Sequence, residues 1–505
     1  MRTKYTTLNF VTSFFPWLII AVIGFVKIKL FIQYFGPEMN GLIQLSGQLY
    51  AYLSLMELGF GSAIIYSLYK PFVDNDQEKI SQLFVGAKSI FKKIGFLIFL
   101  GGFLLSIIVP FIITNLQIPR LYVFAVFFLY AWDYLSMYFL LLPYKVLLQA
   151  DQKKYKLNII TNTRHLIFRL IELLLIINKV NLLLIIIGSI TANLISNLFV
   201  IKTVKKEYPW LNKKDKADTS PMGMTKDVFF HKINRLVFNH TDNIILSIAQ
   251  GLTTVSIYGA YNYIISYLNQ ILNYIFKAPQ ASMGNLHADE KVGISKKEAI
   301  FNEYLSLSFY FALLVVPLFI VSVSSFISVW INKTFVLSSL AIILFGFILW
   351  YEFILVPLVT TLEAKGEYKN IKKADFYSAI TNLVLSFILV FKYGIVGVLI
   401  GTVVSYALVS HILYVRYVYQ SFIEKPVLIY YKKYIVFLIS LIIVIFSQNI
   451  LIKGLNLYNN DNIFQWFLET SFIGSISLIV ITFLFYFFYS SFQNFINRVL
   501  LKRVK

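Results

Sequence analysis

The sequence contains runs of about 17–25 mostly apolar residues, and such runs recur along almost its whole length. Runs of this length match α-helices that cross the hydrocarbon core of a bilayer. Hydrophobic residues make up 58% of the chain and charged residues only 14%, whereas soluble domains carry about 25% charged residues. We therefore predict an all-α polytopic membrane protein with about fourteen transmembrane helices.

The apolar runs also place the expected helices along the chain. The first run is too long for the apolar core of a signal peptide and lacks a small-residue cleavage site, so we expect it to be retained. The expected helices are 8–32, 42–67, 94–115, 121–147, 157–177, 181–202, 229–249, 254–276, 304–330, 334–361, 375–391, 395–418, 434–452 and 464–489.

Basic residues predict the orientation of the chain. Lys and Arg concentrate at the two termini and in every second connection, whereas the intervening connections contain few, namely Arg120, Lys179, Lys333, Lys392 and Lys453. Because short loops rich in Lys and Arg stay in the cytoplasm, we expect both termini there. The net charge of +21 then reflects topology and contact with anionic lipid headgroups, and nucleic-acid binding is not needed to explain it.

Several classes of function lack the residues that they would need. The chain has no Cys, which excludes disulfides, thiolate metal sites and a Cys nucleophile, and its five His are scattered. It has no G-x-x-x-x-G-K-[ST] motif to hold ATP phosphates. The expected outward loops are too short for the external catalytic loops of membrane glycosyltransferases and polymerases. We predict a transporter or a structural membrane protein, with no catalytic residue, cofactor or metal.

An internal repeat favours transport. The stretch PYKVLLQA at 143–150 is similar to PLVTTLEA at 357–364, and each ends an expected helix six helices from the other. A six-helix period preserves orientation, so it predicts two parallel six-helix lobes with the substrate cavity between them. The expected division is 1–228 for the N-terminal lobe, 229–433 for the C-terminal lobe and 434–505 for two appended helices with the tail.

The candidate functional residues are ionisable side chains inside the expected helices. A charge at the bilayer centre costs ~2.5–3.5 kcal/mol on insertion scales, so such residues usually face a bundle interior or a wet cavity. His165, Arg169 and Glu172 share one helix face. The candidates for binding an anionic substrate are Lys27, Arg164, Arg169 and Arg235, and those for ion coupling are Glu57, Asp133 and Asp242.

Each candidate has a simpler interpretation. Lys27, Arg164 and Arg235 could extend along the helix to the headgroup region. Arg169 and Glu172 could form a structural ion pair that joins helices. Aspartate is too short to reach the interface from mid-depth, so Asp133 and Asp242 are expected to meet an arginine, a proton or a cation. Asp242 could also be a permanent structural partner of Arg235.

Three stretches carry a resemblance to a known family. They are ELGFGSAI at 57–64 followed by LYKP at 68–71, NHTDNIILS at 239–247, and SMGNL at 282–286. Together they resemble the Wzx-type polysaccharide flippases, which carry O-antigen and capsule precursors. That family is a branch of the multidrug, oligosaccharidyl-lipid and polysaccharide exporter superfamily. The resemblance extends over most of the chain in helix number, short outer loops and two-lobed repeat.

The resemblance implies a function and a location. It implies that an undecaprenyl-diphosphate-linked oligosaccharide moves by alternating access from the cytoplasmic to the outer leaflet of a bacterial plasma membrane. A polysaccharide polymerase and glycosyltransferases would then be partners, and H⁺ or Na⁺ could couple to transport. The residues agree on one point, because a diphosphate cannot cross hydrocarbon unaided and Arg and Lys offer it charge-assisted hydrogen bonds.

Two rival functions remain open from the sequence. A multidrug extruder of the same superfamily would share the architecture but should favour acidic residues for cationic drugs, whereas Lys27, Arg164, Arg169 and Arg235 favour an anion. A membrane glycosyltransferase or polymerase would need catalytic residues exposed on one face.

Overall fold

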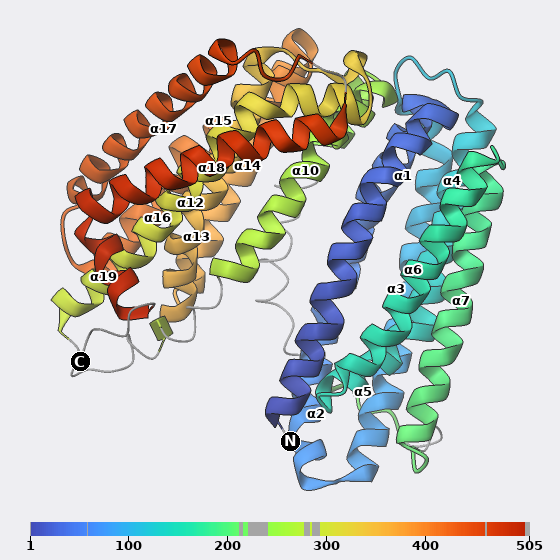
Figure 1. Ribbon diagram of the computed structural model, residues 1–505. Helices are drawn as coiled ribbons and strands as arrows, with labels where there is room; N and C mark the ends of the chain where they lie inside the picture. The colour runs from blue at the N-terminus through green and yellow to red at the C-terminus, as the bar shows by residue number, and fades with distance from the viewer. Residues whose placement is uncertain are drawn as a thin grey trace. The chain divides into compact units, whose positions relative to one another are not determined.

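The computed structural model describes residues 2–57, 59–211, 216–220, 241–276, 283–284, 293–459 and 462–499. Throughout these ranges every regular element is a helix and no strand occurs (Figure 1). Ten segments within them are long and apolar enough to cross a membrane. The expected all-α polytopic fold is confirmed, and the chain is a multi-pass membrane protein.

The helices group into two compact units, Met1–Ile257 and Tyr258–Lys505. The described helices of unit 1 are α1 (Arg2–Leu53), α2 (Phe60–Asp74), α3 (Gln77–Ile112), α4 (Arg120–Ser136), α5 (Leu142–Ala150), α6 (Lys154–Ile177), α7 (Leu182–Glu207) and α9 (Asp242–Ala249). Helix α10 (Leu252–Phe276) passes from unit 1 into unit 2.

Unit 2 continues with the C-terminal helices. They are α12 (Ile294–Trp330), α13 (Ser339–Lys365), α14 (Tyr368–Tyr393), α15 (Ile395–Val404), α16 (His411–Val418), α17 (Leu428–Gly454), α18 (Ile463–Phe488) and α19 (Ser490–Val499). The lobe boundaries expected from the repeat, at 228/229 and 433/434, stay predictions.

The second expected helix, 42–67, is wrong as a single span. Gly36 has φ 84° and ψ 165°, which kinks α1, and the second half of α1 then ends at Leu53. A short 3₁₀ turn, Ser54–Glu57, follows, and Gly59 has φ 81° before α2 begins at Phe60. Because left-handed backbone favours glycine, Gly59 divides the run 42–67 that hydropathy alone reads as continuous, whereas the kink at Gly36 falls between the first and second expected helices.

The fourth expected helix, 121–147, is confirmed with a local change of winding. The π-helical turn Met137–Leu141 separates α4 from α5, and Pro143 follows it at the start of α5. Proline cannot donate a backbone hydrogen bond, and a π turn accommodates the missing donor within one span. The three segments together, Arg120–Ala150, are one of the ten candidate spans.

Small residues let neighbouring helices approach closely in unit 1. A Cβ on Gly102 of α3 would lie 2.6 Å from the hydroxyl of Tyr50 and 2.9 Å from Cβ of Ala131. Tyr50 is fully buried and donates to the carbonyl of Phe127 at 2.6 Å. Helices α1, α3 and α4 therefore pack around Tyr50, as small-residue contacts allow in membrane bundles.

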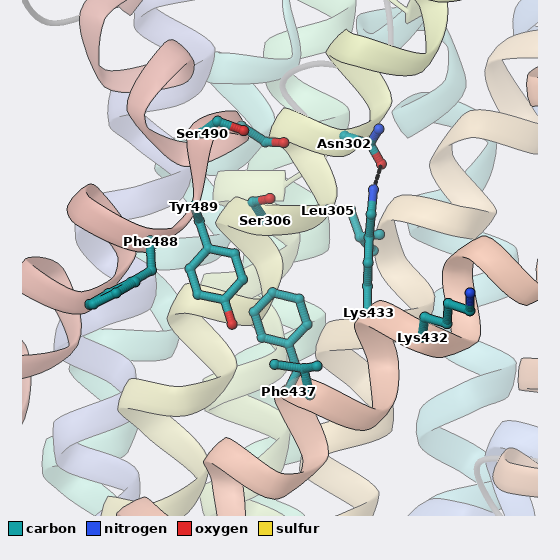
Figure 2. A pocket seen from close by; sticks show the side chains of 11 residues that line it. Asn302, Leu305, Ser306, Lys432, Lys433, Phe437, Phe488, Tyr489 and Ser490 are labelled. Carbon is teal, nitrogen blue, oxygen red and sulfur yellow. Dashed lines mark hydrogen bonds between the residues drawn. The ribbon is translucent and has the colours of Figure 1, made fainter.

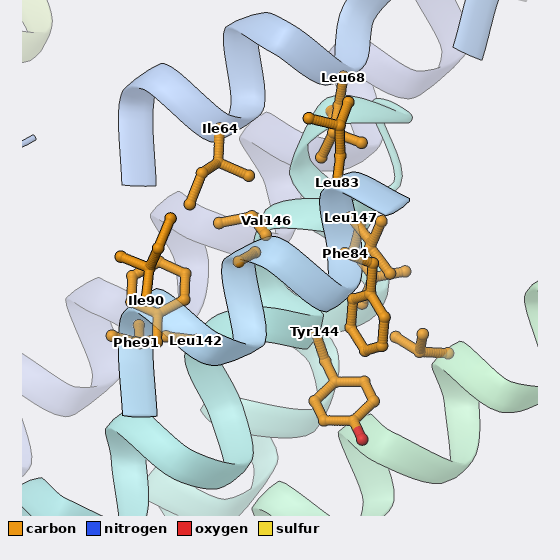
Figure 3. Packing of buried hydrophobic residues seen from close by; sticks show 14 of the residues in the cluster. Ile64, Leu68, Leu83, Phe84, Ile90, Phe91, Leu142, Tyr144, Val146 and Leu147 are labelled. Carbon is orange, nitrogen blue, oxygen red and sulfur yellow. The ribbon is translucent and has the colours of Figure 1, made fainter. Parts of the chain in front are cut away.

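A second apolar core lies where α2, α3 and α5 meet. Figure 3 shows Ile64 and Leu68 of α2 above Phe84 of α3 and Leu147 of α5. The outer faces of the helices are apolar as well, and large apolar side chains such as Phe111 and Phe446 are exposed there. An apolar core with an apolar exterior is the pattern expected of a bundle in lipid.

Candidate functional site

An interior charge cluster lies within unit 1, on helices α1, α4 and α6. We use this name for Lys27, Asp133, Arg164, Arg169 and Glu172. Helix α6 packs against α1 and α7, which positions its charged face among other helices. It corresponds to the expected helix 157–177 and is less apolar than the ten candidate spans because it carries three members of the cluster.

Glu172 pairs with two cations, Lys27 on α1 and Arg169 on its own helix α6. Its Oε1 lies 2.7 Å from Nζ of Lys27 on α1, and its Oε2 lies 2.7 Å from a guanidinium nitrogen of Arg169, one turn earlier on α6. The side chain of Glu172 is only 10% exposed, that of Lys27 19% and that of Arg169 31%. The ammonium of Lys27 is therefore held by a buried carboxylate on α6, a contact that the headgroup interpretation does not provide.

Arg164 forms the second part of the cluster. Its guanidinium contacts Nε2 of His165 at 2.6 Å and interacts electrostatically with Asp133 on α4. Among the described residues no carboxylate lies within 4.0 Å of Arg164, and its buried Nε has no hydrogen-bond acceptor. A buried guanidinium donor without an acceptor is costly, so this side chain has unused capacity to bind an anion.

The cluster carries more positive than negative charge. Lys27, Arg164 and Arg169 face two carboxylates, Glu172 and Asp133. An oxyanion that entered could receive hydrogen bonds from Arg164 and from those guanidinium N–H groups of Arg169 that Glu172 does not occupy. Arg169 is also the most exposed member of its ion-paired trio, so it is the one that an incoming ligand can reach most readily.

Two further residues belong to the site, and sequence reasoning missed both. The amide of Asn193 on α7 donates to Oδ1 of Asp133 at 2.8 Å. The phenol of Tyr130 lies close enough to Glu172 and Asp133 to interact electrostatically with both carboxylates. The available signals were weak, because Asn193 is a lone amide in an apolar run and Tyr130 is one of 34 tyrosines.

The other expected coupling residues lie elsewhere in unit 1. Asp242 is buried at the start of α9, next to Thr241, whose hydroxyl contacts that of Tyr52 on α1 at 2.5 Å. Glu57 accepts a hydrogen bond from Tyr138 at 3.4 Å. Arg235, the expected partner of Asp242, lies outside the described residues.

Glu57 also limits the space beside the α2 glycines. A Cβ on Gly61 would lie 2.8 Å from its Oε1. Within the described ranges Glu57 makes no ion pair or hydrogen bond with the interior charge cluster. The same ranges hold no group of three or more His, Cys, Asp or Glu side chains that could bind a metal ion. The assignment of Glu57, Asp133 and Asp242 to ion coupling stays a prediction.

Solved structures share the arrangement of these helices. A lipid II flippase, MurJ, in an inward closed conformation matches with a TM-score of 0.70 and 15% identity over 95% of this chain and 99% of that one. An inward-facing multidrug resistance transporter of the MATE family and MOP superfamily matches with a TM-score of 0.62 and 12% identity over 81% and 97%.

A third match is the MATE multidrug transporter DinF-BH, with a TM-score of 0.56 and 15% identity over 84% of this chain and 96% of that one. No protein-family model and no curated protein matches the sequence. Identities this low establish the fold alone. The chain therefore has the helical transporter fold that is found in both the MurJ flippase and the MATE transporters.

Proposed function

We propose that the protein is a flippase that moves an undecaprenyl-diphosphate-linked oligosaccharide from the cytoplasmic to the outer leaflet of a bacterial plasma membrane. The observation that carries the proposal is the excess of partly buried cations over carboxylates in the interior charge cluster of unit 1, at Lys27, Arg164 and Arg169. The shared fold with a lipid II flippase supports it, as does the resemblance of three sequence stretches to Wzx-type flippases.

The cluster suits a diphosphate for a physical reason. A diphosphate would lose its hydration in hydrocarbon at a prohibitive cost unless protein groups replaced the water. Arg164 has a buried donor ready for an oxygen, and Arg169 can exchange its bond to Glu172 for one to phosphate. Glu172 then keeps Lys27, so the carboxylate is never left unpaired.

Alternating access would need the empty site to be stable as well. Without substrate, Glu172 binds Lys27 and Arg169 together, which limits repulsion between the two cations. With substrate, the diphosphate supplies the negative charge. In this mechanism Arg169 exchanges Glu172 for the diphosphate when substrate binds and returns to Glu172 when substrate leaves. Binding of H⁺ or Na⁺ at Asp242, Asp133 or Glu57 would couple this cycle to an ion gradient.

Reconstitution can test the function directly. The purified protein in liposomes should make a diphosphate-linked saccharide on the inner leaflet accessible to a membrane-impermeant hydrolase added outside. The Arg164→Ala variant should lose this activity, because it removes the buried donor. A protein that leaves the lipid inaccessible would contradict the proposal.

The second candidate is a multidrug extruder, favoured by the fold shared with MATE transporters. Transport of a cationic dye by the same liposomes, with no movement of the saccharide lipid, would support it instead. A membrane glycosyltransferase or polymerase would be indicated only if the liposomes altered the saccharide chemically.

A further inference from the structure

A pocket of about 430 Å³ lies within unit 2, at one end of α17. Its walls come from α12, the second and third turns of α17 and the α18–α19 junction. Figure 2 shows Lys433 reaching from α17 to Asn302 on α12, with Ser306 and the rings of Phe437 and Tyr489 beside it. The proposed transport mechanism uses none of these residues.

The two charged side chains that line the pocket are both lysines. Nζ of Lys433 donates to Oδ1 of Asn302 at 2.8 Å, and Lys432 also lines the wall. In the described part of the chain no carboxylate lies within 4.0 Å of either lysine. The acidic group that does act on Lys433 is Glu298, which is already paired with Lys425 at 2.6 Å. An ammonium has three donors, so Lys433 can bind an anion and keep Asn302.

Hydroxyl groups and a helix start complete the polar wall. Ser306, Ser490 and Ser491 line the pocket. Helix α19 begins at Ser490, and the carbonyl of Tyr489 accepts from the N–H of Gln493, which makes Tyr489 the residue before the helix. The first N–H groups of a helix have no intrahelical acceptor, and together with serine hydroxyls they suit phosphate oxygens.

The rim of the pocket is apolar and exposed. Val436 of α17 is 49% exposed and Phe488 of α18 is 74% exposed. Exposed apolar residues continue from both along their helices, at Ile439 and Ile443 on α17 and at Leu484 on α18. The pocket therefore lies where a lipid-facing surface meets lysines and serines, which is the chemistry of a membrane–water boundary.

We propose that this pocket binds the phosphate of an anionic phospholipid headgroup. Lys433 and Lys432 supply the charge, the serines supply hydrogen bonds, and the acyl chains stay in the surrounding hydrocarbon. The lateral apolar rim favours a lipid over a soluble anion, because a lipid can enter from the membrane without crossing water. The site is independent of the transported substrate and of the interior charge cluster.

Lipid binding to the full chain tests the proposal. The purified protein in detergent is titrated with phosphatidylglycerol, and bound lipid is counted by native mass spectrometry. Lys433→Gln should weaken binding by roughly tenfold, since a hydrogen bond to a charged group is lost. Asn302→Asp should weaken it comparably, because the new carboxylate would neutralise Lys433. Lys433→Arg should retain binding.

Matched variants and probes separate the alternatives. Lys453→Gln removes the same charge from the other end of α17 and should change nothing. Lys432 is exposed, so its Gln variant should fold and still lose part of the affinity. Unchanged binding in folded Lys433→Gln and Asn302→Asp proteins would overturn the site. Displacement of the lipid by millimolar inorganic phosphate, or preferential binding of undecaprenyl phosphate, would overturn the phospholipid assignment, as would equal binding of phosphatidylcholine.

Discussion

The ammonium of Lys27 on α1 and the carboxylate of Glu172 on α6 lie 2.7 Å apart, although the two residues belong to helices far apart in sequence. Glu172 also binds Arg169, so one buried carboxylate holds two cations. This trio links the helix packing of unit 1 to its proposed anion site, and the first two predictions follow from it.

Removing Glu172 should destabilise the protein more than removing Lys27. Glu172→Gln leaves Lys27 and Arg169 close together without their carboxylate, and breaking a buried ion pair costs about 3–5 kcal/mol. Lys27→Gln leaves Glu172 paired with Arg169 and should cost less. Thermal unfolding in detergent measures both, and a double Lys27→Met, Glu172→Met variant should recover part of the loss. Equal unfolding temperatures for the wild type and Glu172→Gln would show that the trio adds no stability.

Loss of the cluster's cations should abolish transport while the protein still folds. Arg169→Ala should reduce surface polysaccharide strongly, and Arg169→Lys should keep part of it, because the charge survives without the planar guanidinium. Arg235 is not part of the cluster and lies outside the described residues, but as a sequence candidate for substrate binding its Ala variant is expected to act in the same way. Lys27→Gln removes a cation of the cluster and should also reduce transport. Lys29→Gln is its matched control, since Lys29 is exposed two residues further along α1. Normal polysaccharide in the Arg169→Ala and Arg235→Ala variants would leave both residues with packing roles.

The orientation of the chain can be tested with single cysteines, because the natural sequence contains none. Cysteine at Lys206, exposed at the end of α7, should react with an impermeant thiol reagent only after cells are opened. Cysteine at Asn459, between α17 and α18, should react in intact cells. The reverse pattern would place the basic loops outside and contradict the expected topology.

Ion coupling through Asp242 has a specific test. Moving one charge through the membrane potential supplies ~2.3 kcal/mol per 100 mV, enough to bias a lipid distribution more than tenfold. If Asp242 carries the ion, Asp242→Asn in liposomes should transport without responding to an imposed gradient, while unfolding at the wild-type temperature. If it is only a structural partner of Arg235, the variant should express poorly and Arg235→Gln should partly restore it. A folded Asn variant with wild-type gradient dependence would exclude the carrier role.

The apolar runs alone determined the fold class and most helix positions. Burial of about 20 apolar residues in lipid is a local property of each segment, so it can be read without knowing any partner. It failed at 42–67, because the 3₁₀ turn Ser54–Glu57 and Gly59 interrupt the helix through backbone conformation, which hydropathy does not register.

The candidate site was only partly accessible from the sequence. Arg169 and Glu172 share a helix face by spacing, and the structure pairs them at 2.7 Å. That Lys27 completes the trio, and that Asn193 binds Asp133, depends on which helices pack together. Partners on different helices are set by interhelical packing, and apolar runs that resemble one another do not specify it. Local chemistry thus determined which charges enter the membrane, and the tertiary structure decided which of them meet.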